Sequence, residues 1–268
     1  MPAAYGFAIE PAWRLEVVRH ALTPPGWPAG LRLRIAVLAD LHVGEPYMGL
    51  GRIGRIVATA NDLGADLAVV LGDYHASHRF VTRPVLPEEA AAVLGRLRAT
   101  LGRYAILGNH DYWGGAHLWS TALRAAGTRM LENRAVKLGQ GETGFWLGGL
   151  ASMLAIRLGR GRFHGLHNLP HVLAQARDDA PLILLAHEPD IFPTVPARVS
   201  LTLCGHTHGG QVRLAGWSPM VPSKFGNRYA YGHVVEEGRH MVVTGGLGVS
   251  LLPVRLGVPP EVVLVELG

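Results

Sequence analysis

The sequence contains one cysteine, very little lysine and no long apolar run near its start. A single cysteine excludes an intrachain disulfide, and Cys204 ends an apolar run, which predicts a small buried residue. Charged side chains and prolines interrupt residues 1–30, so this stretch offers neither a signal-peptide core nor a membrane span. We therefore expect a cytoplasmic protein, and leave open a peripheral association with a membrane surface.

The charge balance is mildly basic. The net charge of +5 comes from 25 Lys and Arg against 20 Asp and Glu, and nearly all the cations are arginine, whose guanidinium matches phosphate geometry. The cations are scattered, with no basic run interleaved with aromatic residues, so we expect no nucleic-acid partner. A weak attraction to anionic lipids or substrates is compatible with this charge.

Size and composition indicate one α/β domain over residues 1–268. Hydrophobic residues make up 49% of the chain, enough for a sizeable core, while 35 glycines and 18 prolines suit many short elements joined by tight turns. No repeat, low-complexity tract or linker marks a second domain. Residues 1–30 are expected to form an edge strand with a proline-rich lead-in, and residues 152–167 a variable loop.

Five short apolar runs each stop at residues that can bind metals or move protons. Such runs predict buried strands, and the carboxyl ends of parallel strands meet at one edge of a sheet. Any one Asp or Asn after a strand is usually a turn former or helix cap, and a lone histidine is usually structural. Five coincidences are hard to explain in that way. The runs are residues 34–39 before Asp40 and His42, 66–71 before Asp73, 104–107 before Asn109, His110 and Asp111, 181–186 before His187, and 199–203 before His206 and His208.

The stretch from Leu203 to Gln211 carries two of these histidines. Side chains two positions apart in an extended backbone point the same way, so His206 and His208 are expected to present their imidazoles to one small volume. The glycines around them permit close approach of the backbone.

These motifs, in this order, resemble the calcineurin-like metallophosphoesterases, and in particular the small stand-alone phosphodiesterase-like members from bacteria. The resemblance implies a fold of two mixed β-sheets packed face to face and flanked by helices, a four-layer sandwich. Relatives of this branch often carry an amino-terminal membrane segment, which residues 1–30 do not supply. They often carry an acidic residue just after the strand at 145–151, where this chain has Ser152 and Met153.

The resemblance also implies a centre with two divalent metal ions. It assigns Asp40, His42 and His208 to the first ion, Asn109, His187 and His206 to the second, and Asp73 to a bridge between them. A mixed carboxylate, amide and imidazole set suits Mn²⁺, our first expectation, and also Fe, Zn²⁺ or Mg²⁺. Two such ions clamp a phosphoryl group and supply a bound hydroxide near neutral pH.

Several residues near these motifs are candidates for catalysis or substrate binding. His110 follows a ligand and is expected to protonate the leaving oxygen or to bind a phosphoryl oxygen; family practice favours the acid. Asp111 would fix the tautomer of His110, or else cap the next segment. His75 and His78 are rim candidates or plain surface histidines, whereas Glu188 and Asp190 are expected to serve turns and caps. Arg160 and Arg162, in the 152–167 loop, could bind an anionic substrate, although solvation of these arginines is the favoured alternative.

Hydrophobic periodicity predicts the remaining elements. Helices are expected at residues 50–63, 87–101, 118–126 and 169–176, and further strands at 13–19, 145–151, 231–235, 240–244 and 261–267.

The function predicted is hydrolysis of phosphodiester or pyrophosphate bonds in a small or lipid-linked substrate. Alternatives within enzymes are a phosphomonoesterase or a UDP-diacylglucosamine pyrophosphatase. From a different class, the fold could be a non-catalytic metal-binding scaffold, but such degeneration should remove ligands or His110, and none is missing.

Overall fold

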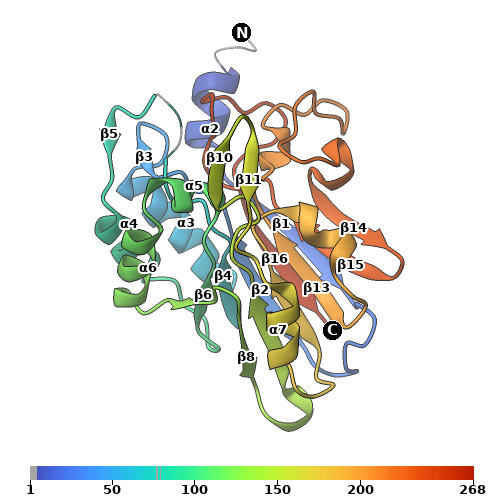
Figure 1. The fold of residues 1–268 in the computed structure, drawn as a ribbon. Helices are drawn as coiled ribbons and strands as arrows, with labels where there is room; N and C mark the ends of the chain where they lie inside the picture. The colour runs from blue at the N-terminus through green and yellow to red at the C-terminus, as the bar shows by residue number, and fades with distance from the viewer. Residues whose placement is uncertain (1–4, 77, 79) are drawn as a thin grey trace.

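Two six-stranded mixed sheets form the centre of the molecule (Figure 1). The computed structural model describes residues 5–76, 78 and 80–268. The first sheet has the strand order β1-β16-β2-β4-β6-β7 and the second β14-β15-β13-β12-β9-β8. The strands of the first sheet are β1 (Glu16–Leu22), β2 (Leu33–Leu38), β4 (Leu67–Val70), β6 (Arg103–Ala105), β7 (Arg129–Met130) and β16 (Glu261–Leu267). Those of the second are β8 (Arg134–Leu138), β9 (Phe145–Gly149), β12 (Leu182–Leu185), β13 (Val199–Cys204), β14 (Gly232–Glu236) and β15 (Arg239–Val243).

The sheets pack face to face through aliphatic side chains on alternate positions of their strands. Ile35 and Val69 of the first sheet join Ile183 and Leu203 of the second in one buried cluster. Helices α3 (Leu50–Asp62), α4 (Pro87–Leu94) and α6 (Ala116–Ala125) cover the outer face of the first sheet, and α7 (Leu169–Gln175) covers that of the second. The expected four-layer α/β sandwich is therefore confirmed.

The central strands of both sheets run parallel, so their carboxyl ends share one edge. In the first sheet β2, β4 and β6 are parallel neighbours, and the chain crosses from β2 to β4 through α3, as expected. In the second, β9, β12, β13 and β15 are parallel neighbours. Antiparallel strands form both edges of the second sheet, β8 beside β9 and β14 beside β15, whereas in the first sheet the antiparallel pair is β16 with β2.

The amino-terminal strand lies at a sheet edge, as expected, but covers Glu16–Leu22 and pairs in parallel with β16. It follows two short helices, η1 (Tyr5–Ile9) and α2 (Glu10–Trp13). Cys204 is a buried free thiol, as predicted. Small further elements are β3 (Gly44–Glu45), β5 (Arg83–Pro84), α5 (Asn109–Gly114), η2 (Gly141–Thr143), η3 (Pro189–Thr194), η4 (His208–Gly210) and η5 (Gly226–Tyr229).

One expected helix is shorter in the structure. The helix expected at 87–101 ends at Leu94; beyond it the backbone N–H of Arg98 donates to the side chain of Asn61, and the amide of Asn61 donates to the carbonyl of Arg96, so these groups pair outside the helix. The variable loop expected at residues 152–167 contains an antiparallel hairpin of β10 (Ile156–Gly159) and β11 (Arg162–His164). Its glycines sit at the turn, where Gly159 and Gly161 have positive φ.

Candidate metal centre and cavity

The polar residues that follow the central strands converge at the shared edge of the two sheets. Asp40, His42 and His208 form one group of potential metal ligands, and Asp73, His187 and His206 form a second. Within each group the ligand atoms lie within 4.8 Å of one another, and every residue named here is at least nine-tenths buried. Each group combines residues from both sheets.

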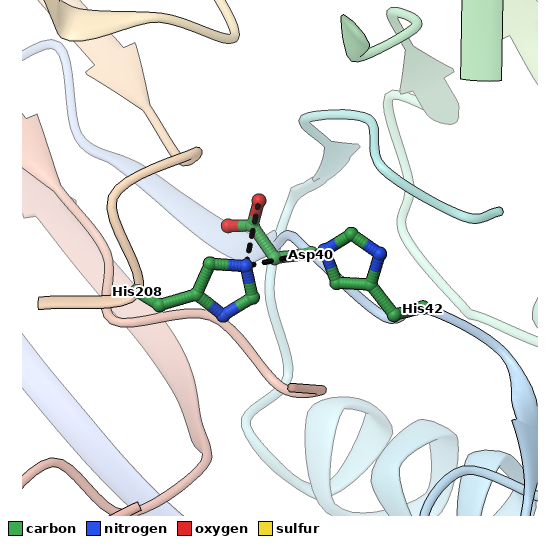
Figure 2. A group of neighbouring side chains, drawn as sticks. All are labelled: Asp40, His42 and His208. Atoms are coloured by element: carbon green, nitrogen blue, oxygen red, sulfur yellow. Dashed lines mark hydrogen bonds and ion pairs between the residues drawn. The ribbon is translucent and has the colours of Figure 1, made fainter. Parts of the chain in front are cut away.

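Ring nitrogens face each other in the first group. Nε2 of His42 lies 3.1 Å from Nε2 of His208, and Oδ1 of Asp40 lies 3.8 Å from the same nitrogen of His208 (Figure 2). Two neutral imidazoles can share at most one proton at that contact. A cation that displaced this proton would take both ring nitrogens and the carboxylate as ligands.

Two members of the second group have unsatisfied ring nitrogens. Nε2 of His187 and Nδ1 of His206 are buried and have no hydrogen-bond partner in the described part of the chain, and the same is true of Oδ1 of Asn109, which lines the same cavity as Asp73 and His206. Buried polar atoms without partners are rare and call for a water molecule or an ion. All three atoms can bind metals, so the residues present fit a divalent cation at this position.

Asp73 lies between the two groups. Its Oδ2 is 3.6 Å from Nε2 of His42 and 3.2 Å from Nε2 of His187, while its Oδ1 accepts the backbone N–H of His110 at 2.9 Å. A side chain at Gly108 would place its Cβ 2.2 Å from Oδ1 of Asp73, so glycine is needed at that position. One carboxylate oxygen thus points at both groups.

Backbone carbonyls select the tautomers of two histidines. Nδ1 of His42 lies 2.8 Å from the carbonyl oxygen of His75, and Nδ1 of His187 lies 2.7 Å from that of Leu71. Each Nδ1–H donates to its carbonyl, which turns Nε2 toward the centre. Burial opposes a charge on His187, but Asp73 beside it holds the pKa of this ring well above its ordinary value, so a metal ion bound at its Nε2 would displace a proton. The structure therefore presents these rings as ligands.

The electrostatics of the centre keep most of these imidazoles neutral. Burial lowers the pKa of His42 to about 4, and it also lowers the pKa of His206 and His208. Burial raises the pKa of Asp40 to about 7. Burial likewise disfavours the charge on Asp73, but His187 beside it outweighs this and holds the pKa of Asp73 well below its ordinary value. Cations would offset the same carboxylate charges.

The loops that carry these residues have unusual backbone conformations. Asp40, His42, Asp73, His206 and His208 all have φ between 45° and 72°, a left-handed region that non-glycine residues enter at a cost. His206 and His208 were expected to share one volume because the strand would continue in extended form. Both residues line one cavity, but the extended strand is not the reason. β13 ends at Cys204, the chain turns, and the two rings enter different groups.

A cavity of about 450 Å³ opens from the centre and includes His110 in its lining. The ring of His110 packs edge-on against Trp113 at 4.7 Å and against His42 at 5.1 Å, and burial lowers its pKa to about 3. Leu154 and Phe163 add apolar walls on the same side. The cavity joins a polar floor to apolar walls.

Asp111 does not orient His110, which corrects that part of the expectation. Its carboxylate accepts the backbone N–H groups of Asp73, Tyr74, His75 and Gly108 at 2.8–2.9 Å. Both oxygens are therefore committed to the two loops that carry Asp73 and Asn109. Its alternative role, capping α5, agrees with the bond to Gly108.

The three residues predicted to contact substrate, His75, Arg160 and Arg162, lie outside the cavity lining. His75 contributes its carbonyl oxygen to His42, while its ring packs over Gly114 and is absent from the cavity lining. Arg160 and Arg162 lie exposed at and after the hairpin turn. His78 is buried, with ring contacts to Tyr47 and Phe80.

Of the three arginines in the 152–167 segment, all of which offer a fork suited to phosphate, Arg157 is the one that lines the cavity. Its guanidinium lies 3.5 Å from the ring centroid of Trp113, and Phe163, its cross-strand partner, stacks on the same ring at 5.7 Å. The indole N–H of Trp113 donates to the carbonyl of Leu154 at 3.0 Å, which fixes the ring. Only the hairpin register, which places Arg157 opposite Phe163, could have indicated this.

Two further supports of the centre were missed by the sequence reasoning. Arg255 is fully buried behind His208, with Nη2 3.2 Å from Nδ1 of that ring, and it donates to the carbonyls of Gly245 and Gly248. The backbone N–H of Gly248 donates to the carbonyl of Asp40 at 2.6 Å. A glycine-rich stretch after β15 was the available signal.

Glu188 and Asp190 serve structure, as expected. Glu188 accepts the hydroxyl of Ser152 and, at 2.9 Å, the backbone N–H of Met153, so its carboxylate lies beside the position where relatives often carry an acidic residue. Asp190 accepts the hydroxyl of Ser223 and the backbone N–H of Lys224.

Comparison with known proteins gives a consistent result. A family model described as calcineurin-like phosphoesterase matches residues 33–210. The chain is 30% identical to the uncharacterized metallophosphoesterase YkuE of Bacillus subtilis (strain 168), over 98% of this chain and 89% of that protein. It is 31% identical to the phosphodiesterase YaeI of Escherichia coli (strain K12), over 96% of this chain and 90% of that one.

Solved structures with this fold include a putative 5'-nucleotidase from Staphylococcus aureus. The TM-score is 0.53 at 12% identity, over 81% of this chain and 49% of the solved chain, so this chain spans about half of it. At that identity the likeness concerns the fold alone.

Proposed function

The chain belongs to the calcineurin-like phosphoesterase family and is a phosphoester hydrolase, and within that class we propose that it cleaves phosphodiester or pyrophosphate bonds with two divalent metal ions. The observation that carries the proposal is the pair of ligand groups that share Asp73. Three buried atoms that can bind a metal, on Asn109, His187 and His206, lack a hydrogen-bond partner in the described part of the chain and support it. Mn²⁺ is our first choice of metal, because the donors combine carboxylates, an amide and imidazoles. The cytoplasmic location expected from the sequence remains a prediction.

Each proposed ligand has a defined place. Asp40, His42 and His208 would hold the first ion, Asn109, His187 and His206 the second, and Asp73 both. When bound, the two ions supply Lewis acidity and a water molecule acidic enough to lose its proton near neutral pH.

The residues of the chain position the substrate around that centre. The phosphoryl group lies on the polar floor of the cavity, and its organic substituent extends along Trp113, Leu154 and Phe163. His110 lies where the two parts of the cavity meet and donates a proton to the leaving oxygen. In the free protein burial keeps this ring neutral, and a bound phosphoryl anion would raise its pKa. The alternative is that the neutral ring donates its N–H to a phosphoryl oxygen.

Metal analysis combined with a substrate panel tests the proposal. Protein purified without chelator should contain two ions per chain and should hydrolyse p-nitrophenyl diesters or pyrophosphates faster than monoesters. Asp73→Asn should lose most activity and at least one ion, because a neutral amide cannot offset two cations as a shared carboxylate does. Glu188→Gln is the matched control, since it neutralises a buried carboxylate outside both groups.

Other results would point elsewhere. A preference for monoesters would favour a phosphomonoesterase, and cleavage of UDP-diacylglucosamine would favour that pyrophosphatase. Bound metal with no hydrolysis of any phosphoester would favour a non-catalytic scaffold. An Asp73→Asn variant that kept both ions and near-normal turnover would contradict the bridging assignment.

A further inference from the structure

The mouth of the cavity is surrounded by large apolar side chains that are exposed. Three segments contribute to the cavity lining at its mouth: the β10–β11 hairpin through Phe163, the loop before β14 through Met220, and the loop before β16 through Leu251. We call the exposed apolar side chains of residues 156–163, 214–220 and 251–252 the rim surface. Contiguous exposed apolar surface of this kind is uncommon on a soluble protein and marks an interaction site.

The exposure within the rim surface is high. Leu158, Trp217 and Leu252 have exposed fractions of 55%, 59% and 54%, and those of Met220 and Leu251 are higher than all three. A hydrogen bond joins the loop before β14 to the loop before β16, because the side-chain amide of Gln211 donates to the carbonyl of Leu252 at 3.2 Å. In Figure 1 the hairpin and the loops before β14 lie at the same end of the molecule, opposite the turn after β8.

The charge of these segments is of one sign. Residues 150–168, 205–235 and 245–260 contain no Asp or Glu, although the whole chain has 20. The same segments carry cations at exposed or half-exposed positions around the rim surface. They are Arg157, Arg160, Arg162, Arg213 and Lys224. Glu188 and Asp190, from another segment, line an adjoining hollow with Phe163 and Lys224, and Asp190 accepts the backbone N–H of Lys224. The five cations outnumber these two carboxylates, so the face around the mouth is apolar and predominantly cationic, which favours an anionic partner that also has an apolar phase.

The turn at residues 214–217 of the rim surface can move from water into lipid with the backbone groups at its two ends still hydrogen-bonded. Leu214 and Trp217 exchange two backbone hydrogen bonds, at 2.9 and 3.0 Å, so the turn between them satisfies its own ends. In the hairpin Arg157 points at Trp113, whereas the side chains of Ile156 and Leu158 on either side of it are exposed to solvent. Tryptophan at such a tip matches the headgroup level of a bilayer.

We propose that the rim surface docks on a lipid bilayer containing anionic phospholipid, so that the mouth of the cavity faces the membrane. Apolar tips enter the headgroup boundary while the arginines and Lys224 contact lipid phosphates. No helix in the described ranges is long and apolar enough to cross a membrane, so contact would be made by these loops. The corollary, that the substrate is a phosphoester or pyrophosphate carried by a lipid, rests on the proposed function; the docking itself does not.

Vesicle co-sedimentation of the full, metal-loaded chain tests the docking. The protein should bind phosphatidylcholine vesicles that contain phosphatidylglycerol, bind pure phosphatidylcholine much less, and lose binding as salt screens the charges. Trp217→Ser with Leu252→Ser should weaken binding on the order of tenfold, through lost apolar area. Leu118→Ser with Leu86→Ser is the matched control, because both leucines are similarly exposed, at 54% and 58%, and lie on other elements.

A charge series tests the second component. Arg160→Ala and Arg162→Ala should each weaken binding to the anionic vesicles by about fivefold, whereas Arg98→Ala, exposed in the segment that leads into the amino end of β6, should not. None of these side chains lines the cavity, so turnover of a small soluble diester should stay unchanged. That turnover and an unaltered melting temperature show that each variant is folded.

Two results would overturn the docking: no binding to anionic vesicles, or equal weakening by the rim pair and the control pair. Either result together with normal hydrolysis of soluble diesters leaves the proposed function standing. Binding that follows the expected pattern in a protein inactive on every phosphoester supports the docking and removes the proposed function instead.

Discussion

Asp111 offers a quantitative test of how the centre is held together. Its buried carboxylate accepts four backbone N–H groups, from Asp73, Tyr74, His75 and Gly108. In Asp111→Asn the amide oxygen can keep two of these donors, and the new NH₂ group faces the other two. Each buried N–H that loses its acceptor costs about 1–3 kcal/mol, so the variant should lose about 2–6 kcal/mol of unfolding free energy. That is a large part of the ~5–15 kcal/mol of a typical domain.

The loss should also reach the metal ions, because three of the four donors lie in the loop of Asp73 and the fourth, Gly108, precedes Asn109. We expect Asp111→Asn to retain fewer ions and to hydrolyse a soluble diester more slowly in proportion. Urea unfolding of the metal-free protein measures the stability term alone, and elemental analysis after desalting measures the ions. Asp190→Asn is the control, since that carboxylate accepts one backbone N–H and a serine hydroxyl away from the centre.

The reasoning fails if Asp111→Asn unfolds within about 1 kcal/mol of the wild type and keeps the full complement of ions, a difference smaller than one lost acceptor. A variant of normal stability with reduced turnover only for poor leaving groups would instead restore Asp111 as a partner of His110.

Three further outcomes are expected. His110→Ala should retain metal while kcat falls on the order of 10²–10⁴-fold, less for p-nitrophenol esters than for poor leaving groups; equal losses would assign His110 to phosphoryl binding. Arg157→Ala should raise KM for a small anionic diester on the order of tenfold, because it lines the cavity over Trp113, and Arg160→Ala should not. Burial raises the pKa of Glu132 from its ordinary 4.5 to about 7, so the folded protein binds more protons between those values and its stability falls as pH rises through that window, by on the order of 3 kcal/mol. Glu132→Gln should flatten the dependence of the melting temperature on pH over that window. An unchanged slope would contradict the attribution of this pH dependence to Glu132.

The sequence was sufficient for the fold and for which residues meet. Buried parallel strands appear in the sequence as short apolar runs, and the residues just after those runs lie at one edge of the sheet. The sequence alone was therefore enough to predict that Asp40, Asp73 and His187 lie close together. The division of the histidines into two groups followed from family resemblance. The extended-strand argument for His206 and His208 gave the wrong reason, because positive φ values redirect both rings.

What the sequence could not supply depends on register and on contacts between distant segments. Arg157 and Arg160 look equivalent in the chain, and only the pairing of Arg157 with Phe163 places one in the cavity and leaves the other at a turn. Arg255 sits alone in an apolar stretch, and nothing local indicates that it lies behind His208. Asp111 follows His110 directly, yet its partners come mostly from a loop 36 to 38 residues away.

The division of the ligand groups between the two sheets has a mechanical consequence. Aliphatic side chains between packed sheets tolerate small slides, since one methyl contact replaces another at little cost. Donors that must converge on an ion tolerate far less, because ligand distances are fixed to within about 0.2 Å. Metal binding is therefore more sensitive than the hydrophobic core to the alignment of the two sheets. Val69→Ala or Ile183→Val, a conservative change between the sheets at a position that is not a ligand, shifts that alignment. Each should weaken metal retention before it causes the protein to unfold.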